Sequence, residues 1–275
     1  MTFLFLRKGT FLFLFNKLIL PLLKDRQKDI LLLLYRFRFL KRSQIQTLLK
    51  HKQFNRIIIW LNDLTEKQYV RRYYDQKFAP DISVYSLGNT ARSYFRQNPD
   101  KKIHTALLDR VWREHKYSQA FRNHWVFLAD IYISLLSLAG KTGATLKFFT
   151  QVDLCKMRYL IDPAPDAFFS ITEKAGSTQR YFLDIFDLYV HRAEMQKRFR
   201  QYFHYYEKRD WQDHNENPFP LIIFIAPNDW AKGYLGRNIK KLLKQKEDNL
   251  QFYLSTWGEI KARGITKETL HKIEI

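Results

Sequence analysis

Cysteine is nearly absent from this sequence. The 275 residues include a single one, Cys155, which excludes an internal disulfide framework and any zinc site built from several cysteines. Its neighbours are apolar and basic, and no histidine stands at a matching ligand spacing, so we expect a buried structural thiol. The absence of disulfides fits a reducing, cytoplasmic setting.

Several catalytic signatures are also missing. The 9 glycines form no Gly-rich phosphate loop, and the chain contains no G-x-S-x-G sequence and no kinase-like set of motifs. With 46% hydrophobic and 27% charged residues, the sequence is nevertheless that of a folded globular protein.

Acidic residues are few relative to basic ones. The chain has 27 Asp and Glu against 47 Lys and Arg, a formal net charge of +20. A surplus that large favours contact with a polyanion and opposes the compact state by self-repulsion. Nucleic acid is the most common such partner and an anionic membrane surface the next; a generally basic proteome is the neutral alternative. Charge alone does not separate DNA from RNA.

A long uninterrupted apolar run is missing, even at the N-terminus. Residues 1–23 are rich in Phe and Leu, but Arg7, Lys8, Asn16 and Lys17 interrupt them. A spanning helix needs about 20 continuous apolar residues, and no small-residue cleavage site of a signal peptide follows. We interpret residues 1–23 as an apolar extension outside the fold and expect no membrane partner.

Residues 24–98 have the pattern of a small DNA-binding domain. Apolar residues at helical spacing predict helices over 24–39, over 44–50 with Ser43 as N-cap, and over 53–64. Two short runs of β-formers, 69–74 and 83–87, follow on either side of a polar turn. Three helices followed by a two-stranded hairpin is the winged-helix order.

This segment also concentrates positive charge, with 16 Lys and Arg against 6 Asp and Glu. In a helix-turn-helix the second helix of the motif enters the major groove, while flanking loops contact phosphates. The predicted DNA-binding residues are Arg42, Lys50, Lys52, Gln53, Asn55 and Arg56 around the helices and Arg71, Arg72 and Lys77 on the wing. The alternative is a winged helix that serves protein contacts and leaves these cations solvated.

Residues 104–275 predict a second domain, separated from the first by a linker at 98–102. Helices are expected over 104–117, 121–139, 190–207 and 230–244, and strands over 145–152, 166–172, 180–187, 220–226 and 250–255. The fold class is therefore mixed α/β, with helices on both faces of a mixed sheet.

Two acidic residues stand on strands expected to be hairpin neighbours, Asp166 at the head of one and Asp184 within the next. Carboxylates that met at one edge of the sheet could hold Mg²⁺ or Mn²⁺, and a nuclease of this design uses the metal to activate water. A lysine is often found two residues after the second acid, on the same strand face. That position is Phe186, so the pattern is incomplete.

Other residues could complete such a site. Lys197 or Arg198 on the following helix could supply the cation, and Asp130 on the preceding helix could supply a carboxylate. Asp187 should face away from Asp184, because it lies an odd number of residues along the strand. The alternative is that Asp166 only begins a strand and that Asp184 is an ordinary polar residue.

The order of these elements and several short motifs resemble the replication-relaxation family, whose members are associated with plasmid replication and relaxation of plasmid DNA. The most specific match is His124 followed by Asp130 six residues later and Tyr132 two beyond. Residues 165–167 and 182–185 resemble the family's two acidic strands, and Arg198 and Tyr202 stand where it usually has Lys and Tyr. Asp184 replaces the more usual Glu, and Phe186 replaces a second acid.

The resemblance implies a winged helix joined to a domain like the PD-(D/E)xK nucleases. It implies double-stranded DNA at an origin-like site as the partner, with replication or mobilisation proteins as further partners and a homodimer as one possible state. Two functions stay open besides a binding factor for replication or relaxation. One is a metal-dependent nickase that uses Asp166 and Asp184. The other is a transcription regulator whose second domain dimerises or senses a ligand.

Overall fold

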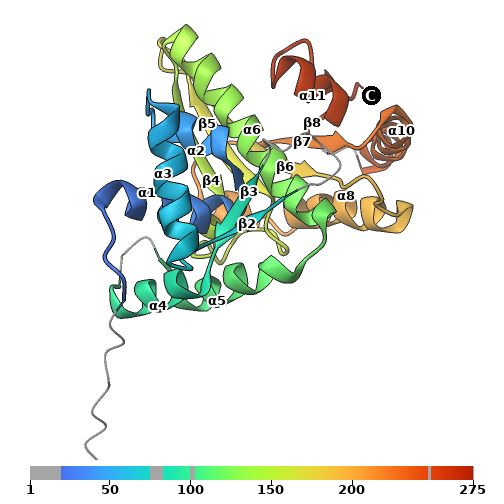
Figure 1. Ribbon diagram of the computed structural model, residues 1–275. Helices are drawn as coiled ribbons and strands as arrows, with labels where there is room; N and C mark the ends of the chain where they lie inside the picture. The colour runs from blue at the N-terminus through green and yellow to red at the C-terminus, as the bar shows by residue number, and fades with distance from the viewer. Residues whose placement is uncertain (1–19, 75–82, 100–102, 247–248, 275) are drawn as a thin grey trace, which may run out of the picture.

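The computed structural model describes residues 20–74, 83–99, 103–246 and 249–274 (Figure 1). Its first part contains the helices α1 (Asp25–Phe37), α2 (Arg42–Leu48) and α3 (Phe54–Glu66). A small antiparallel sheet of β1 (Leu40–Lys41), β2 (Val70–Tyr73) and β3 (Val84–Leu87) has the order β1-β3-β2. We call residues 20–99 the N-terminal module. The expected Ser43 N-cap is wrong, because α2 already begins at Arg42.

Apolar residues at helical spacing give the module its core. Ile30, Leu31 and Leu34 of α1 and Ile57 and Leu61 of α3 are fully buried, because each set falls on one face of its helix. Residues 20–23 are attached to the rest of the module, since the Tyr69 hydroxyl donates to the carbonyl of Pro21. The rest of the expected N-terminal extension lies outside the described residues.

The sequence did not predict α4 (Asn89–Gln97), which begins directly after β3. Gly88 permits this turn, because a Cβ there would lie 2.2 Å from the carbonyl oxygen of Gln68. Helix α4 packs on α5 (Thr105–Arg113), where Arg92 and Arg96 both bind Asp109. Residues 100–102 of the linker expected at 98–102 lie outside the described residues.

The second part is built on a mixed sheet, as the sequence predicted, but the sheet has six strands and the short last one was not expected. Its strands are β4 (Thr145–Thr150), β5 (Ala167–Thr172), β6 (Thr178–Ile185), β7 (Leu221–Ala226), β8 (Phe252–Thr256) and β9 (His271–Lys272), in chain order across the sheet. Strands β6, β7 and β8 are parallel, and the pairs β4–β5, β5–β6 and β8–β9 are antiparallel.

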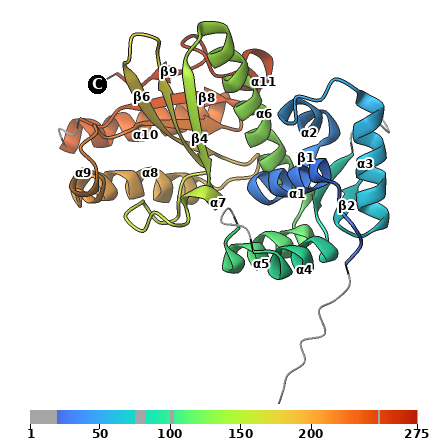
Figure 2. The ribbon, with the colours of Figure 1, turned by 90° about the vertical axis from the view of Figure 1, so that its left-hand side faces the viewer.

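Helices cover both faces of this sheet (Figure 2). Leu183 and Ile185 of β6 face the core that contains α6 (Gln119–Thr142), whereas Phe182 and Phe186 face α8 (Arg192–Glu207) and α10 (Asp229–Lys246). This alternation follows from the two-residue period of a strand. The short helices α7 (Gln151–Leu154), α9 (Asp210–His214) and α11 (Trp257–Arg263) and the 3-10 turn Glu114–Lys116 complete the chain.

The core on the α6 face continues without interruption into the N-terminal module. Ile30 and Leu61 of the module belong to the same apolar cluster as Leu128 of α6 and Ile223 of β7. Among the described residues, α6 is long and apolar enough to cross a membrane by length and composition, and here it packs on α1, α2 and β4. The expected burial of Cys155 is wrong, because its side chain is exposed beyond the end of α7.

Candidate functional site

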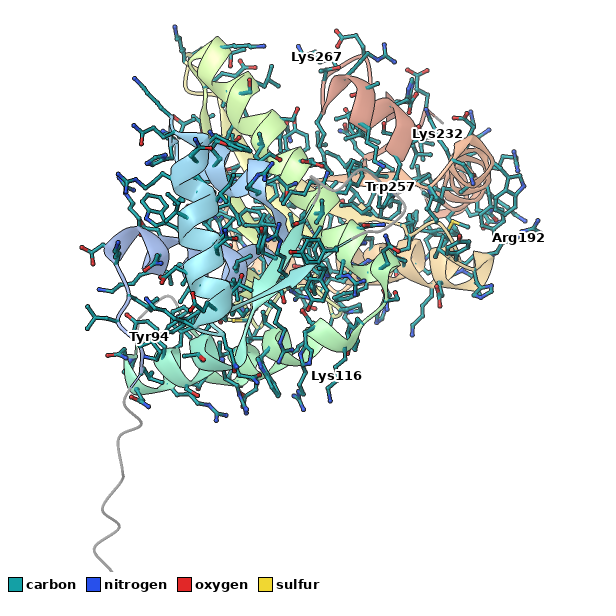
Figure 3. All side chains as sticks on the ribbon, in the orientation of Figure 1. Tyr94, Lys116, Arg192, Lys232, Trp257 and Lys267 are labelled. Atoms are coloured by element: carbon teal, nitrogen blue, oxygen red, sulfur yellow. The ribbon has the colours of Figure 1, made fainter. Side chains whose placement is uncertain are left out.

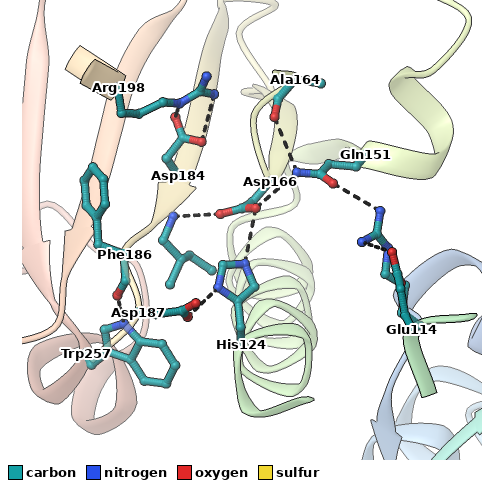
Figure 4. Close-up of polar contacts among 12 residues, drawn as sticks. Glu114, His124, Gln151, Ala164, Asp166, Asp184, Phe186, Asp187, Arg198 and Trp257 are labelled. Atoms are coloured by element: carbon teal, nitrogen blue, oxygen red, sulfur yellow. Dashed lines mark hydrogen bonds and ion pairs between the residues drawn. The ribbon is translucent and has the colours of Figure 1, made fainter. Parts of the chain in front are cut away.

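Asp184, on β6, lies at the centre of a buried group of polar side chains (Figure 4). Arg198 donates from Nε and Nη2 to its two carboxylate oxygens at 3.0 and 2.9 Å. The Tyr202 hydroxyl donates to Oδ2 at 2.7 Å. Arg198 and Tyr202 are four residues apart on α8 and therefore share the face that meets β6. The planar guanidinium matches the carboxylate in two parallel hydrogen bonds.

The electrostatics of this group favour the ion pair. Burial lowers the pKa of Arg198, but the neighbouring Asp184 charge outweighs burial and raises it above its ordinary value. Burial and the Asp184 charge hold the pKa of Tyr202 well above 10, so its hydroxyl remains a proton donor. Burial raises the pKa of Asp184 more than the Arg198 charge lowers it. The two parallel hydrogen bonds are nevertheless those of a guanidinium–carboxylate pair, so we describe the group as a charged pair with a neutral phenol.

Asp166 has different partners. Its Oδ2 accepts from the backbone N–H of Ile185 at 2.8 Å, and its Oδ1 lies 3.2 Å from His124 Nε2 and 3.3 Å from Gln151 Nε2. The other ring nitrogen of His124 lies 2.9 Å from Asp187 Oδ1. Asp166 and Asp184 are thus bound to opposite layers, Asp166 to α6 and Asp184 to α8.

His124 lies between two carboxylates, which determines its protonation. Burial lowers its pKa, but the charges and hydrogen bonds of Asp166 and Asp187 raise it to about 10. For Asp166, burial raises the pKa while His124 lowers it, and the net shift is downward. Both ring nitrogens then donate, as only the imidazolium can.

Asp187 binds His124 on the α6 side of the sheet, whereas Asp184 binds Arg198 on the α8 side. Asp187 therefore points away from Asp184, as strand alternation predicted. The position expected to carry a lysine is apolar: the Phe186 ring packs on Phe224 at 5.3 Å between centroids. Its carbonyl accepts from Trp257 Nε1 at 2.9 Å, so Phe186 anchors the end of β6.

A chain of polar contacts links Asp166 to the N-terminal module. Gln151 accepts from Arg38 Nη2 at 3.1 Å, and Arg38 Nη1 donates to Glu114 at 2.9 Å. Arg38 stacks on Trp125 at 3.8 Å, and burial lowers its pKa to about 10. Sequence reasoning missed this role; the available signal was an arginine between two core phenylalanines, Phe37 and Phe39.

The motif residues Asp130 and Tyr132 also contact the module. Gln44 of α2 donates to Asp130 Oδ1 at 2.6 Å, and Lys41 lies 3.6 Å from Oδ2. Tyr132 stacks on Phe37 at 5.2 Å. We call Asp166, Asp184 and the side chains bound to them the acidic centre. Asp130 contributes no carboxylate to this centre. Helix α6 connects the centre, through His124, with α1 and α2.

The acidic centre does not fit a divalent cation in this arrangement. Both oxygens of Asp184 are taken by Arg198 and Tyr202, and those of Asp166 by Ile185, His124 and Gln151. Across the described residues, no group of three or more His, Cys, Asp or Glu could hold a metal. Lys197 is exposed on α8, so Arg198 supplies the cation that meets Asp184.

The predicted DNA-binding residues of the second helix and its turn lie at the surface. Lys50, Lys52, Gln53, Asn55 and Arg56 are exposed around the turn between α2 and α3. Lys50 has a positive φ of 51°, and His51 Nδ1 accepts from the backbone N–H of Gln53 at 3.2 Å. The His51 ring packs on Trp60 of α3. These two contacts stabilise the conformation of the turn.

The predicted wing residues have partners within the protein. Arg71 donates to Asn89 at 2.6 Å and Arg72 to Ser83 at 2.9 Å, so both guanidinium groups lie against the module. Lys77 lies outside the described residues. The exposed positive charge therefore lies at the turn between α2 and α3 more than on β2.

Comparisons with known proteins complete the description. A family model described as replication-relaxation matches residues 31–222. No curated protein matches the chain. Among solved structures, a mutant of ZitR from Lactococcus lactis is similar over 43% of this chain and 75% of its own, with 16% identity and a TM-score of 0.24.

Proposed function

Since this chain belongs to the replication-relaxation family, we propose that it binds duplex DNA through its N-terminal module, in plasmid replication or relaxation. The order of α1, α2, α3, β2 and β3 is that of a winged helix, and α3 would then be the helix that enters the major groove. The DNA is a plasmid origin-like site, and replication or mobilisation proteins are further partners.

The observation that carries this proposal is the distribution of unpaired cations in the module. Its other cations mostly bind protein carboxylates, as Arg36 binds Asp153 and Lys67 binds Asp63. Four cations without a carboxylate partner in the described chain gather at one place: Arg42, Lys50, Lys52 and Arg56. Cations that the protein leaves unneutralised are those that can replace counterions on phosphates.

The exposed face of α3 also carries groups that read bases. Asn55 can bind adenine and Arg56 guanine by paired hydrogen bonds. Ile59 is 58% exposed one turn further along the same face, and an apolar side chain there suits the methyl group of thymine. Figure 2 shows that α3 lies at an outer edge of the molecule.

The test is duplex binding measured by fluorescence anisotropy over a salt series. The Lys52→Ala, Arg56→Ala variant should bind more weakly, and the slope of log affinity against log salt should flatten by about 1.8, since each phosphate contact contributes about 0.9. A Lys267→Ala, Lys272→Ala variant is the matched control, because these exposed lysines lie on the C-terminal part. A wild-type affinity insensitive to salt would refute the proposal.

We propose that the acidic centre supports the fold and that Arg198 takes the place of a metal. Nicking of supercoiled plasmid with Mg²⁺ or Mn²⁺ should then be no faster with wild-type protein than with a folded Asp166→Asn variant. Metal-dependent nicking that this variant lacks would restore the nickase hypothesis and its PD-(D/E)xK-like domain.

The transcription-regulator alternative predicts binding to the protein's own promoter without an effect on plasmid replication. A homodimer and the cytoplasmic location stay predictions.

A further inference from the structure

One face of α10 carries aromatic residues at its beginning and cations further along. Trp230, Tyr234, Arg237, Lys241 and Lys244 follow one another at intervals of four, three, four and three residues. At 3.6 residues per turn these positions form one stripe, about 21 Å long. We propose that this stripe, together with Tyr189 and Arg192, binds single-stranded DNA.

Two aromatic side chains of this surface, those of Trp230 and Tyr189, are exposed, and Tyr234 is partly buried against the core. Trp230 is 51% and Tyr189 83% exposed, and neighbouring Leu188 is 57% exposed. Trp230 and Tyr234 are nearly parallel, with ring centroids 5.8 Å apart and an angle of 13°. The Arg192 guanidinium lies 4.8 Å from the Trp230 centroid and 5.7 Å from that of Tyr234. This arrangement leaves ring surface available for stacking with a base.

The loop that presents Tyr189 is fixed just before it. Asp187 binds His124, the Phe186 carbonyl accepts from Trp257, and the N–H of Val190 donates to the carbonyl of Asp187 at 3.1 Å. Arg192 follows Tyr189 by three residues and contacts Trp230, so Tyr189 lies close to the start of the stripe. Trp230, whose ring is held by Tyr234 and Arg192, loses less conformational entropy on binding than a free side chain would.

The cations of α10 divide into paired and unpaired groups. Lys232 binds Glu259 and Lys246 binds Glu207. The remaining ones, Arg237, Lys240, Lys241 and Lys244, are exposed and have no ion-pair partner in the described residues. Among the described residues, the exposed acids beside these cations are Asp229 and Glu194, together with Glu207, which Lys246 neutralises. This part of the surface therefore keeps a net positive charge. Such a charge complements a phosphate backbone.

These features suit unpaired bases better than a duplex. Aromatic rings can stack only on bases that are not already stacked and paired, and the cations then follow the backbone. Arg192 marks this surface in Figure 3, and α10 and α3 lie at opposite ends of the molecule in both ribbon views. The inference rests on the proposed function, because a protein that opens or relaxes a duplex meets single strands beside it.

The experiment uses the full chain and a labelled 20-nucleotide oligo-dT, with anisotropy read at constant salt. Stacking contributes about 1–3 kcal/mol per base, so Trp230→Ala should weaken oligo-dT binding by about 5-fold to 150-fold. Trp230→Phe should restore part of the affinity, because it keeps an aromatic ring. Trp230 is the tryptophan with an exposed side chain, so quenching of its fluorescence by unlabelled oligo-dT, absent in Trp230→Phe, gives an independent readout.

The duplex-binding variant separates this inference from the proposed function. Lys52→Ala, Arg56→Ala should lose duplex affinity and keep oligo-dT affinity, and Trp230→Ala should do the reverse. Unchanged oligo-dT binding by both Trp230→Ala and Tyr189→Ala, or no binding by wild-type protein, would overturn the inference and leave the duplex proposal standing. A dimer that Trp230→Ala dissociates, with oligo-dT binding unaltered, would assign the surface to a second copy of the chain instead.

Discussion

Removal of the His124 imidazole should change how the free energy of unfolding depends on pH. The pKa of His124 is about 10 in the folded chain and about 6.5 when unfolded. Because the folded value is the higher one, the stabilisation is complete below pH 6.5 and is lost as the pH rises to about 10. At about 1.36 kcal/mol per pKa unit, it amounts to about 4–5 kcal/mol.

The quantity to measure is the slope of the free energy of unfolding against pH. Between pH 7 and pH 9 the unfolded chain has released this proton and the folded chain has kept it, so unfolding becomes easier by about 1.36 kcal/mol per pH unit. Urea unfolding of wild-type protein should therefore lose about 2.5 kcal/mol more over this interval than unfolding of His124→Gln. The Cys155→Ser background removes a second titratable group, since partial burial raises the pKa of the Cys155 thiol in the folded chain above its ordinary value.

A matched control separates His124 from histidines in general. His204 is exposed on α8, so His204→Gln should keep the wild-type slope. If His124→Gln folds too poorly, ¹⁵N NMR of the wild-type imidazole at pH 8 serves instead and should show both ring nitrogens protonated. Equal slopes for wild type and His124→Gln, or a neutral His124 at pH 8, would refute the ion-pair description.

Three further outcomes follow from the same contacts. Arg198→Met should lower the free energy of unfolding by about 3–5 kcal/mol, because it leaves Asp184 buried and uncompensated. Urea unfolding should show much of this loss recovered in the double variant Asp184→Leu, Arg198→Met. A double variant as unstable as the single one would contradict this reasoning. Gln44→Ala should cost about 1–3 kcal/mol, since it leaves Asp130 and the Val126 carbonyl without their amide donor; an unchanged unfolding midpoint would show that these contacts contribute little. Gly88→Ala should destabilise the module by about 1–3 kcal/mol through overpacking against Gln68, and thermal unfolding equal to wild type would contradict it.

Much of the fold follows from the sequence because its signals are local. The apolar stripes of α1 and α3 and the buried run of β7 each predict an element whose bounds are correct to within a few residues. Helix α4 was missed because its helical pattern is short and polar, and the close approach of Gly88 to Gln68 fixes where it begins. That contact joins distant parts of the chain, which periodicity does not report.

The candidate site was less accessible to sequence reasoning. Asp166 and Asp184 could be placed on neighbouring strands, but the identity of their partners depends on how α6 and α8 pack. Lys197 and Arg198 are adjacent in sequence, and only the rotation of α8 decides which of them meets Asp184. Strand alternation placed Asp187 on the face opposite Asp184, but its contact with His124 depends on how α6 packs on that face.

The continuous core beneath α1, α3 and α6 limits how this protein can be divided in the laboratory. A fragment ending near residue 99 would lose Glu114, the partner of buried Arg38, and would uncover the apolar side of α1 that meets α6. Such a fragment would tend to aggregate. Chimaeras that aim to transfer the DNA-recognition surface to another protein should therefore carry α6 along with it.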